Sequence, residues 1–292
     1  MKKLLRIFFI LATIATTSMS FADTLDRLLR NELLTIGYTT RNTFPFSYAS
    51  TSGEPRGYVV ELCQRIIQLV GGGKVSPQIK YLPVEPGRRV AMLANGTTDL
   101  DCSPNSENEL REAQVAFLPT IFVDETRLMV PATSKARSVN DLRGKRVAVL
   151  SGSSNVQIAM KLDKEKSLNL TVVPLKSWEE VVSYLDGGNA DAYLNSDSFI
   201  RTRWAREGAK GQRLLPDFSE HRARAIMIGS DEKRFRDSAE LALRKMVKSG
   251  EFEKIYDRWF LSAIQPDGIN LQIPMHNELR QWVNATKASK AP

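Results

Sequence analysis

The order of apolar segments along the chain constrains the fold more than any other feature. Three apolar runs, at 33–38, 79–84 and 98–102, have the length and composition of strands. Segments at 57–70 and 88–94 lie between them and carry apolar residues at helical spacing. Strands that alternate with helices in this way indicate an α/β fold with a largely parallel sheet.

A second unit repeats this alternation after residue 140. Predicted strands at 146–150, 170–174 and 190–194 are separated by predicted helices at 155–162 and 178–185. A chain of 292 residues is long enough to build two modest domains, each with its own core. We therefore expect two similar α/β lobes.

The C-terminal part has fewer but clear signals. An apolar strand is predicted at 225–228, and apolar positions between 241 and 260 indicate amphipathic helix. Its aromatic residues at helical spacing favour core packing over a ligand site. The polar tail from Lys287 is expected to fray.

Residues 1–22 are typical of a cleavable secretory signal. Lys2, Lys3 and Arg6 precede an apolar run at 7–14, and the segment ends in small residues. The run is much shorter than the roughly 20 residues that a membrane-spanning helix needs. The sequence therefore predicts a secreted protein in the periplasm rather than a membrane-anchored one.

The charge distribution gives no indication of nucleic-acid binding. The formal net charge is +8, and three of the positive residues lie within 1–22, which leaves about +5 for the secreted chain. These charges are dispersed, without a block of five or six like residues. We expect no nucleic-acid partner.

The cysteine and histidine content is low. Cys63 and Cys102 form either a single disulfide, which an oxidising compartment favours, or two buried thiols. The chain has no CxxC or HExxH motif, and His221 and His276 are far apart in sequence. We therefore predict no metal site and no cofactor.

A series of short motifs runs in order along the chain. They are Pro45-Phe46-Ser47-Tyr48, Gly57-Tyr58, Asn95-Gly96-Thr97 with Asp99 and Cys102, Thr126-Arg127-Leu128, Asp141-Leu142-x-Gly144-Lys145, Ser151-Gly152, Ala190-Asp191-Ala192 and Trp259-Phe260 with Pro266 and Asn270. In this order the motifs resemble the periplasmic amino-acid-binding proteins of ABC transporters, in the glutamate/aspartate-binding group of the family-3 solute-binding proteins. The resemblance covers essentially the whole secreted chain.

The resemblance implies a type II periplasmic-binding-protein fold, with two lobes of mixed sheets flanked by helices and two hinge crossovers. Lobe 1 would comprise 23–130 and 226–292, and lobe 2 would comprise 131–225. A small anionic solute, glutamate, aspartate or a related amino acid, would bind between the lobes by hinge closure. A monomeric protein would then deliver it to the membrane permease of an ABC transporter.

The resemblance also assigns arginines to the solute. A carboxylate held away from water needs charge-assisted donors, and the arginine fork matches its geometry. Arg89 and Arg111 match carboxylate-binding positions of the group, and Arg41 lies in the loop after the first strand, where a third arginine is expected. In lobe 2, Ser153 and Ser154 at the start of the helix at 155–162 offer hydroxyl and backbone N–H donors or serve as a plain helix cap. Arg111 itself should lie on the second turn of a helix that a Ser106-x-x-Glu109 capping box begins.

The chain departs from the group at three places, one of which is Trp178, where the group commonly has a histidine. Ser103 and Asn105 flank Pro104, which lacks the N–H and hydroxyl that the group offers the solute there. Ser196 stands where a carboxylate usually pairs with the ammonium group of the solute, and Asp197 follows it. Either a one-residue shift brings Asp197 into that role, or the solute is a dicarboxylate that has no amino group.

Two other functions are compatible with the same fold. Secreted dehydratases that act on cyclic carboxylates would use the arginines to hold substrate, with Glu61, Asp101 or Asp197 as a general acid or base. A sensory ligand-binding module is the second alternative. We favour a solute-binding protein that is not an enzyme.

Overall fold

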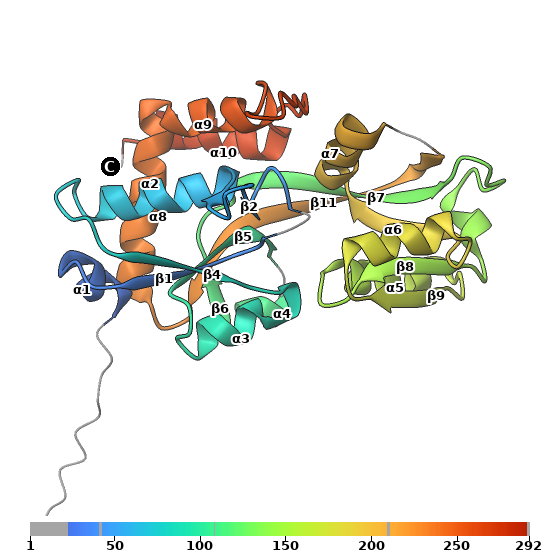
Figure 1. Ribbon diagram of the computed structural model, residues 1–292, viewed down its shortest axis with the longest axis horizontal. Coiled ribbons are helices and arrows are strands. Elements are labelled where there is room, and N and C mark those ends of the chain that lie inside the picture. The colour runs from blue at the N-terminus through green and yellow to red at the C-terminus, as the bar shows by residue number, and fades with distance from the viewer. Residues whose placement is uncertain (1–22, 41–42, 108, 209–210, 291–292) are drawn as a thin grey trace, which may run out of the picture.

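The computed structural model describes residues 23–40, 43–107, 109–208 and 211–290. They form two lobes joined by two long strands, β7 and β11 (Figure 1). The predicted signal at 1–22 lies outside the described residues and stays a prediction. Among the described helices, none is long and apolar enough to cross a membrane.

Lobe 1 contains the start and the end of the described chain. Its N-terminal part comprises α1 (Thr24–Leu29), β1 (Leu34–Tyr38), β2 (Tyr48–Ala49), β3 (Pro55–Arg56), α2 (Tyr58–Val70), β4 (Ile79–Pro83), a 3-10 helix (Pro86–Arg88), α3 (Arg89–Ala94), β5 (Leu100–Ser106), α4 (Glu109–Glu112) and β6 (Val115–Phe117). Its C-terminal part comprises α8 (Lys233–Ser249), α9 (Glu251–Phe260) and α10 (Asn277–Ala288).

The middle of the chain forms lobe 2 and both connecting strands. Its elements are β7 (Phe122–Pro131), a 3-10 helix (Val139–Leu142), β8 (Arg146–Leu150), α5 (Asn155–Lys166), β9 (Thr171–Leu175), α6 (Trp178–Asp186), β10 (Ala192–Ser196), α7 (Asp197–Glu207) and β11 (Gln212–Gly229).

A continuous mixed sheet passes through both lobes in the order β4-β1-β5-β11-β7-β10-β8-β9, with β6 also paired to β11. In lobe 1, β1 is parallel to β4 and β5, and in lobe 2, β8 is parallel to β9 and β10. The short β2 and β3 form a separate antiparallel pair. The long β7 and β11 are antiparallel to each other. The predicted α/β class with mixed sheets and two crossovers is therefore confirmed.

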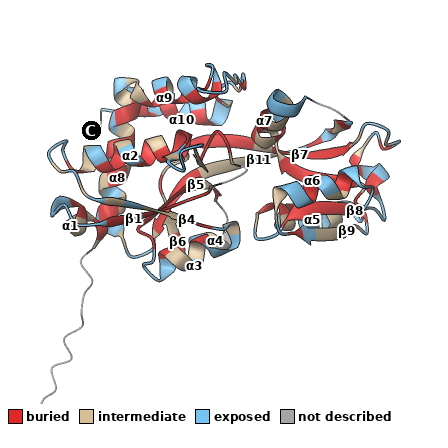
Figure 2. Cartoon of the chain, in the orientation of Figure 1, coloured by how far each residue is buried: buried red, intermediate tan, exposed pale blue. Residues whose placement is uncertain are grey.

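Each lobe has its own apolar core. One large cluster draws on residues from 28 to 123 and from 226 to 283, and two smaller clusters draw on residues from 128 to 218. Figure 2 shows these buried positions inside both lobes. The crossover points at Val130 and Ala225 lie on β7 and β11, and the lobe boundaries drawn there stay a prediction.

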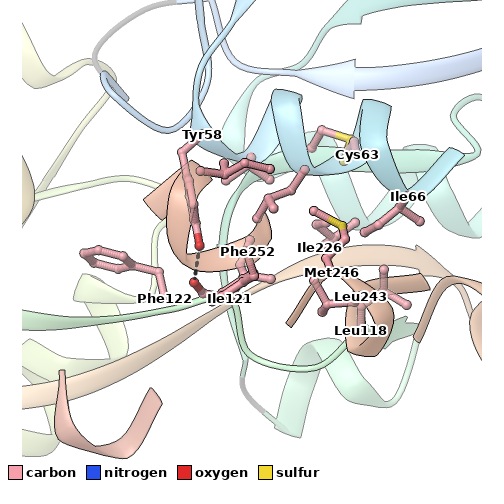
Figure 3. Close-up of a cluster of buried hydrophobic side chains, with 14 of the residues drawn as sticks. Tyr58, Cys63, Ile66, Leu118, Ile121, Phe122, Ile226, Leu243, Met246 and Phe252 are labelled. Atoms are coloured by element: carbon pink, nitrogen blue, oxygen red, sulfur yellow. Dashed lines mark hydrogen bonds between the residues drawn. A yellow bond between two sulfur atoms is a disulfide. The ribbon is translucent and has the colours of Figure 1, made fainter. Parts of the chain in front are cut away.

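Aromatic residues fill the lobe 1 core where α2, α9 and β7 meet. Tyr58 is fully buried, and its hydroxyl donates to the carbonyl of Ile121 at 2.7 Å (Figure 3). Phe122 stacks on Tyr256 with ring centroids 5.9 Å apart, and Phe260 packs against both rings. The prediction that the C-terminal aromatics form core is confirmed.

One predicted helix start is wrong. Ser106 is the last residue of β5 and does not cap a helix, and the helix that follows has only four residues, Glu109–Glu112. Arg111 is therefore in a single short turn rather than on a second turn. The Ser-x-x-Glu spacing does not begin a helix here because β5 continues to Ser106 through its pairing with Arg224 of β11.

The two cysteines are joined across the lobe 1 core. Cys63 of α2 and Cys102 of β5 form a disulfide with a sulfur–sulfur distance of 1.98 Å, and both residues are buried. The bond closes a loop with a sequence separation of 39 residues. It ties α2 to a strand whose C-terminal end reaches the space between the lobes.

Replacing Cys63 and Cys102 together with Ala should lower the free energy of unfolding by about 3–4 kcal/mol, because the unfolded chain regains the freedom that the closed loop removes. Urea denaturation of the oxidised wild type and the double variant measures the difference. The wild type under reducing conditions should lose a similar amount. A loss below about 1 kcal/mol in both comparisons would show that the bond contributes little.

Candidate ligand-binding cleft

A cleft of about 750 Å³ lies between the lobes, and both lobes and both connecting strands line it. Its apolar wall includes Phe44, Phe46, Trp178 and Phe199. The polar and charged residues that line it are Thr39, Thr40, Thr43, Glu85, Arg89, Ser106, Arg111, Asp124, Ser153, Ser154, Asn155, Lys176, Ser177, Glu179, Asn195, Ser196, Ser198 and Arg224.

Five of the residues predicted from the sequence to bind the solute line this cleft: Arg89, Arg111, Ser153, Ser154 and Ser196. They come from separate segments of lobe 1 and lobe 2, and the fold brings them together. Their contact with a solute stays a prediction.

The other four predicted residues are placed differently. Ser103 and Asn105 are fully buried and lie behind the cleft wall, and Asp197 is not among the lining residues. Arg41 lies outside the described residues. Asp197 begins α7, and its carboxylate accepts a hydrogen bond from Arg201 Nε at 2.5 Å, one turn along the helix.

Arg89 is held in place by a polar network under the cleft. Its Nη2 donates to Thr39 Oγ1 at 2.7 Å, and its Nη1 donates to Asn105 Oδ1 at 3.2 Å. Asn105 in turn donates to the carboxylate of Asp101 at 2.8 Å, and the hydroxyl of Thr39 donates to Ser103 Oγ at 2.9 Å. Ser103 and Asn105 therefore position Arg89 and Thr39 instead of facing the cleft themselves.

A third arginine of the cleft, Arg224, was not predicted from the sequence. It lies on β11, where its Nη1 donates to Ser106 Oγ at 2.6 Å and its Nη2 lies 3.4 Å from Asp124 of β7. The backbone carbonyl of Ser106 accepts from Arg111 Nη1 at 3.0 Å. Ser106 thus holds two cleft arginines, one through its side chain and one through its backbone.

Arg89 and Arg111 are buried near other arginines, and this environment disfavours their positive charges. Burial lowers the pKa of Arg111 to about 10, and the nearby charges of Arg89 and Arg224 contribute to the lowering. Burial also lowers the pKa of Arg89, although Asp101 opposes this effect. An anion in the cleft would offset this crowding of positive charge.

Several donors in the cleft have no protein partner. Arg89 Nε, Arg224 Nε and Asn195 Nδ2 are buried and make no hydrogen bond within the described part of the chain. Buried donors of this kind are costly unless a bound group satisfies them. All three belong to residues that line the cleft.

Lobe 2 contributes the start of α5. The hydroxyl of Ser153 donates to the carbonyl of Leu150 at 2.6 Å, and its oxygen accepts from the backbone N–H of Asn155 at 3.3 Å. Ser154 Oγ lies 3.3 Å from Ser106 Oγ of lobe 1. Ser153 is thus engaged in its own turn, whereas Ser154 reaches across the cleft.

Asp124 is a buried carboxylate of the cleft, and sequence reasoning did not find it either. One of its oxygens accepts from the backbone N–H groups of Glu125 at 3.0 Å and Ser198 at 3.2 Å, and the other accepts from Ser198 Oγ at 2.5 Å. Burial raises its pKa, whereas Arg224 and Ser198 oppose the rise. The carboxylate is therefore already well supplied with donors, and Arg224 is its nearest cationic partner.

The sequence matches a family model. Residues 34–262 match the bacterial extracellular solute-binding proteins, family 3. The chain belongs to this family. A Pseudomonas aeruginosa L-glutamate/L-aspartate-binding protein is 28% identical over 272 residues, which cover 92% of this chain and 89% of that protein. The glutamate/aspartate import solute-binding protein of Escherichia coli is 28% identical over 265 residues, with 88% and 86% of the two chains covered.

A solved structure also shares the fold. It is the substrate-binding protein of an ABC uptake transporter from Streptococcus pneumoniae with bound histidine, with a TM-score of 0.72 and 20% sequence identity. The match covers 82% of this chain and 96% of that one. This confirms the type II solute-binding fold of family 3.

The comparisons answer the question of catalysis. Family 3 consists of solute-binding proteins, and this chain belongs to it, so it is a solute-binding protein rather than an enzyme. The carboxylates considered as acids or bases also lie elsewhere. Glu61 accepts from Trp259 Nε1 at 2.6 Å, and neither Glu61 nor Asp101 is among the residues that line the cleft.

Replacing Arg111 with Met should raise the free energy of unfolding of the ligand-free protein by about 0.5–2 kcal/mol, because it removes a cation that burial and two other arginines disfavour. Urea denaturation at pH 7 measures the change. The matched control is Lys135→Met, which removes an exposed cation and should change stability by less than about 0.5 kcal/mol. A marked loss of stability on replacing Arg111 would mean that the guanidinium is a structural group.

Proposed function

We propose that this protein captures L-glutamate or L-aspartate in the cleft between its lobes and delivers it to the membrane permease of an ABC importer. The observation that carries the proposal is the group of three arginines, Arg89, Arg111 and Arg224, on the cleft wall. The names of the Pseudomonas and Escherichia relatives support the choice of solute.

The charges and donors of the cleft suit a small solute with two carboxylates. The crowding of Arg89, Arg111 and Arg224 favours a dianion, which would return the pKa of Arg111 toward its ordinary value. Asn195 Nδ2 and the hydroxyl of Ser154 add uncharged donors from lobe 2. A dianion held by both lobes would stabilise the closed arrangement, because it contacts donors that are apart when the lobes separate.

Contacts between the lobes support closure around a solute. Gly152, before α5, has a φ of +71°, and a Cβ at this position would lie 2.9 Å from the Cα of Gly87 in lobe 1. Thr202 of α7 donates to the backbone carbonyl of Phe44 at 3.2 Å, and the guanidinium of Arg206 lies 4.3 Å from the centre of the Phe44 ring. The lobes can approach this closely only because the residues that meet, Gly152 and Gly87, have no side chains.

A solute with two carboxylates and no amino group is the second candidate. Ser196 lines the cleft where the family resemblance leads us to expect a carboxylate, and Asp197 pairs with Arg201 instead. The carboxylate of Asp124 already accepts from Glu125 and Ser198. A buried ammonium group would therefore depend on carboxylates that have other partners.

Secretion and the permease complete the proposal. Removal of the signal at 1–22 would release the protein into the periplasm as a monomer. Lobe 1, at 23–130 and 226–292, and lobe 2, at 131–225, would then both present surfaces to the permease when closed. The family's extracellular solute-binding role supports this arrangement.

Matched pairs of solutes test the ligand directly. L-Glutamate and glutarate, and L-aspartate and succinate, differ only by the amino group. We expect each amino acid to bind and to raise the stability of the protein by about 2.7 kcal/mol at a concentration 100 times its dissociation constant. Isothermal titration calorimetry and thermal denaturation with the four compounds measure this.

The same titration with Arg111→Met should show affinity weakened by at least about 30-fold, because a buried carboxylate loses its charge-assisted donor. Lys135→Met serves as the control and should bind as the wild type does. Tighter binding of glutarate and succinate would select the second candidate. If none of the four compounds bound the wild type, the anionic-solute proposal would fail.

Gly152→Ala should weaken solute binding by at least about tenfold, because the added methyl group meets Gly87 and prevents full approach of the lobes. Gly188→Ala is the matched control, since Gly188 is also in lobe 2 with a φ of +71° and has nothing within 4 Å of the place that an added methyl group would take. Both variants should lose about 1 kcal/mol of stability from backbone strain. Equal solute affinity in the two variants would show that the Gly152 contact plays no part in closure.

A further inference from the structure

The fold brings together the two histidines of the chain, which are far apart in sequence. His221 lies on β11, and His276 precedes α10 as its N-terminal cap. Their ring centroids are 4.4 Å apart with the rings nearly perpendicular. Their distance in sequence gave no indication of this contact, and it removes the basis for expecting no metal site.

A carboxylate completes the group. Glu125 of β7 is the direct cross-strand partner of His221. Glu125, His221 and His276 each offer one ligand atom, and these atoms all lie within 4.8 Å of one another. None of the three residues lines the cleft. Side chains alternate along a strand, so Asp124 faces the cleft and Glu125 faces the other side of the ribbon that β7 and β11 form.

The surroundings of His221 orient it as a metal ligand. Its Nδ1 lies 3.0 Å from Glu278 Oε1, and its side chain is 47% exposed. A carboxylate that accepts from Nδ1–H leaves Nε2 as the basic nitrogen, which is the usual arrangement around metal-binding histidines. The exposure gives an ion access to that nitrogen.

Glu125 is held in a similar way. Its Oε2 accepts from Ser219 Oγ at 2.7 Å and from Arg127 Nη1 at 3.1 Å. Oε1 of the same carboxylate is then the atom that can bind a cation, and the two bonds fix its direction.

His276 has a weaker competing contact. Its Nδ1 accepts from the backbone N–H of Glu278 at 3.3 Å, at the start of α10. An ion bound at Nδ1 would replace this long hydrogen bond, and an ion bound at Nε2 would move the proton to Nδ1. Either change gives up one long hydrogen bond to gain a metal–nitrogen bond.

We propose that Glu125, His221 and His276 bind one divalent transition-metal ion, of which Zn²⁺ is the example used below. Two imidazoles and one carboxylate suit Zn²⁺ or another divalent first-row transition metal, and water would complete the coordination. The ion would join β7, β11 and the start of α10 on the side of the ribbon away from the cleft. The proposal does not rest on the identity of the solute.

The test uses the secreted chain without an affinity tag, because tag histidines would bind the same ions. Titration with Zn²⁺ by calorimetry should show one ion per chain, and the ion should raise the thermal denaturation temperature until EDTA removes it. The cysteines form a disulfide and do not compete. The result that would overturn the proposal is the absence of a stoichiometric site in the wild type.

Variants show whether the named residues form that site. His276→Asn keeps an oxygen acceptor at the cap of α10 but removes the imidazole, and His221→Gln removes the other one. Each should weaken Zn²⁺ binding by at least about tenfold, and Glu278→Gln should weaken it by about 10- to 100-fold through His221. Circular dichroism without metal checks that the variants fold.

The cleft variant Arg111→Met should bind Zn²⁺ as tightly as the wild type, because the two sites share no residue. Unchanged Zn²⁺ binding in both histidine variants would place the ion elsewhere and overturn the assignment. Loss of solute binding with retained Zn²⁺ binding, or the reverse, separates this proposal from the solute proposal.

Discussion

The antiparallel pairing of β7 and β11 is the constraint on which the rest of the structure depends. These strands carry the sheet from one lobe into the other, and their pairing extends from Gln212 opposite Pro131 to Arg224 opposite Phe122. In the described part of the chain, the sheet therefore passes between the lobes through a ribbon two strands wide. Such a ribbon holds the lobes in register and still bends more easily than either lobe.

The ribbon also brings charge to the bottom of the cleft. Arg224 on β11 and Asp124 on β7 lie 3.4 Å apart, and Ser106 at the end of β5 holds Arg224 from the lobe 1 side. Burying these groups costs solvation energy, and the hydrogen bonds among them offset only part of it. The remaining cost is the physical reason that an anion should bind between the lobes, since it satisfies donors that the protein leaves open.

Much of the fold could be predicted from the sequence because most elements have a clear apolar period. The strand at 146–150 and the helix that begins at residue 155 occur where the pattern places them. The predictions were weakest on the ribbon and on α7. Residues 219–224 of β11 are nearly all polar, and α7 has buried residues at only a few positions. Their structure depends on pairing and packing with distant segments, which a local pattern does not contain.

The same reason limits what the sequence predicts about the cleft. Arg89 and Arg111 could be proposed because short motifs around them resemble a family, and both line the cleft. Arg224 lies in a segment with no such motif, and its role follows only from its contact with Asp124, 3.4 Å away on the neighbouring strand. Ser103 and Asn105 follow Cys102 on β5, but the alternation of the strand turns Asn105 toward Arg89 and Ser103 toward Thr39.

Side chains alternate between the two faces of β7 and β11, so neighbouring residues lie in different chemical environments. Asp124 faces the cleft and the arginines, whereas Glu125, the next residue, faces His221, Ser219 and Arg127. A one-residue shift of β11 against β7 would turn His221 to the cleft side and Arg224 away from it, while Asp124 and Glu125 kept their faces. Register shifts in β11 lie on both sides of this stretch, between Leu214 and Ser219 and between Ala225 and Met227, so residues 219–224 pair with β7 in one register. The pairing register therefore fixes the chemistry of the cleft and of the histidine pair together.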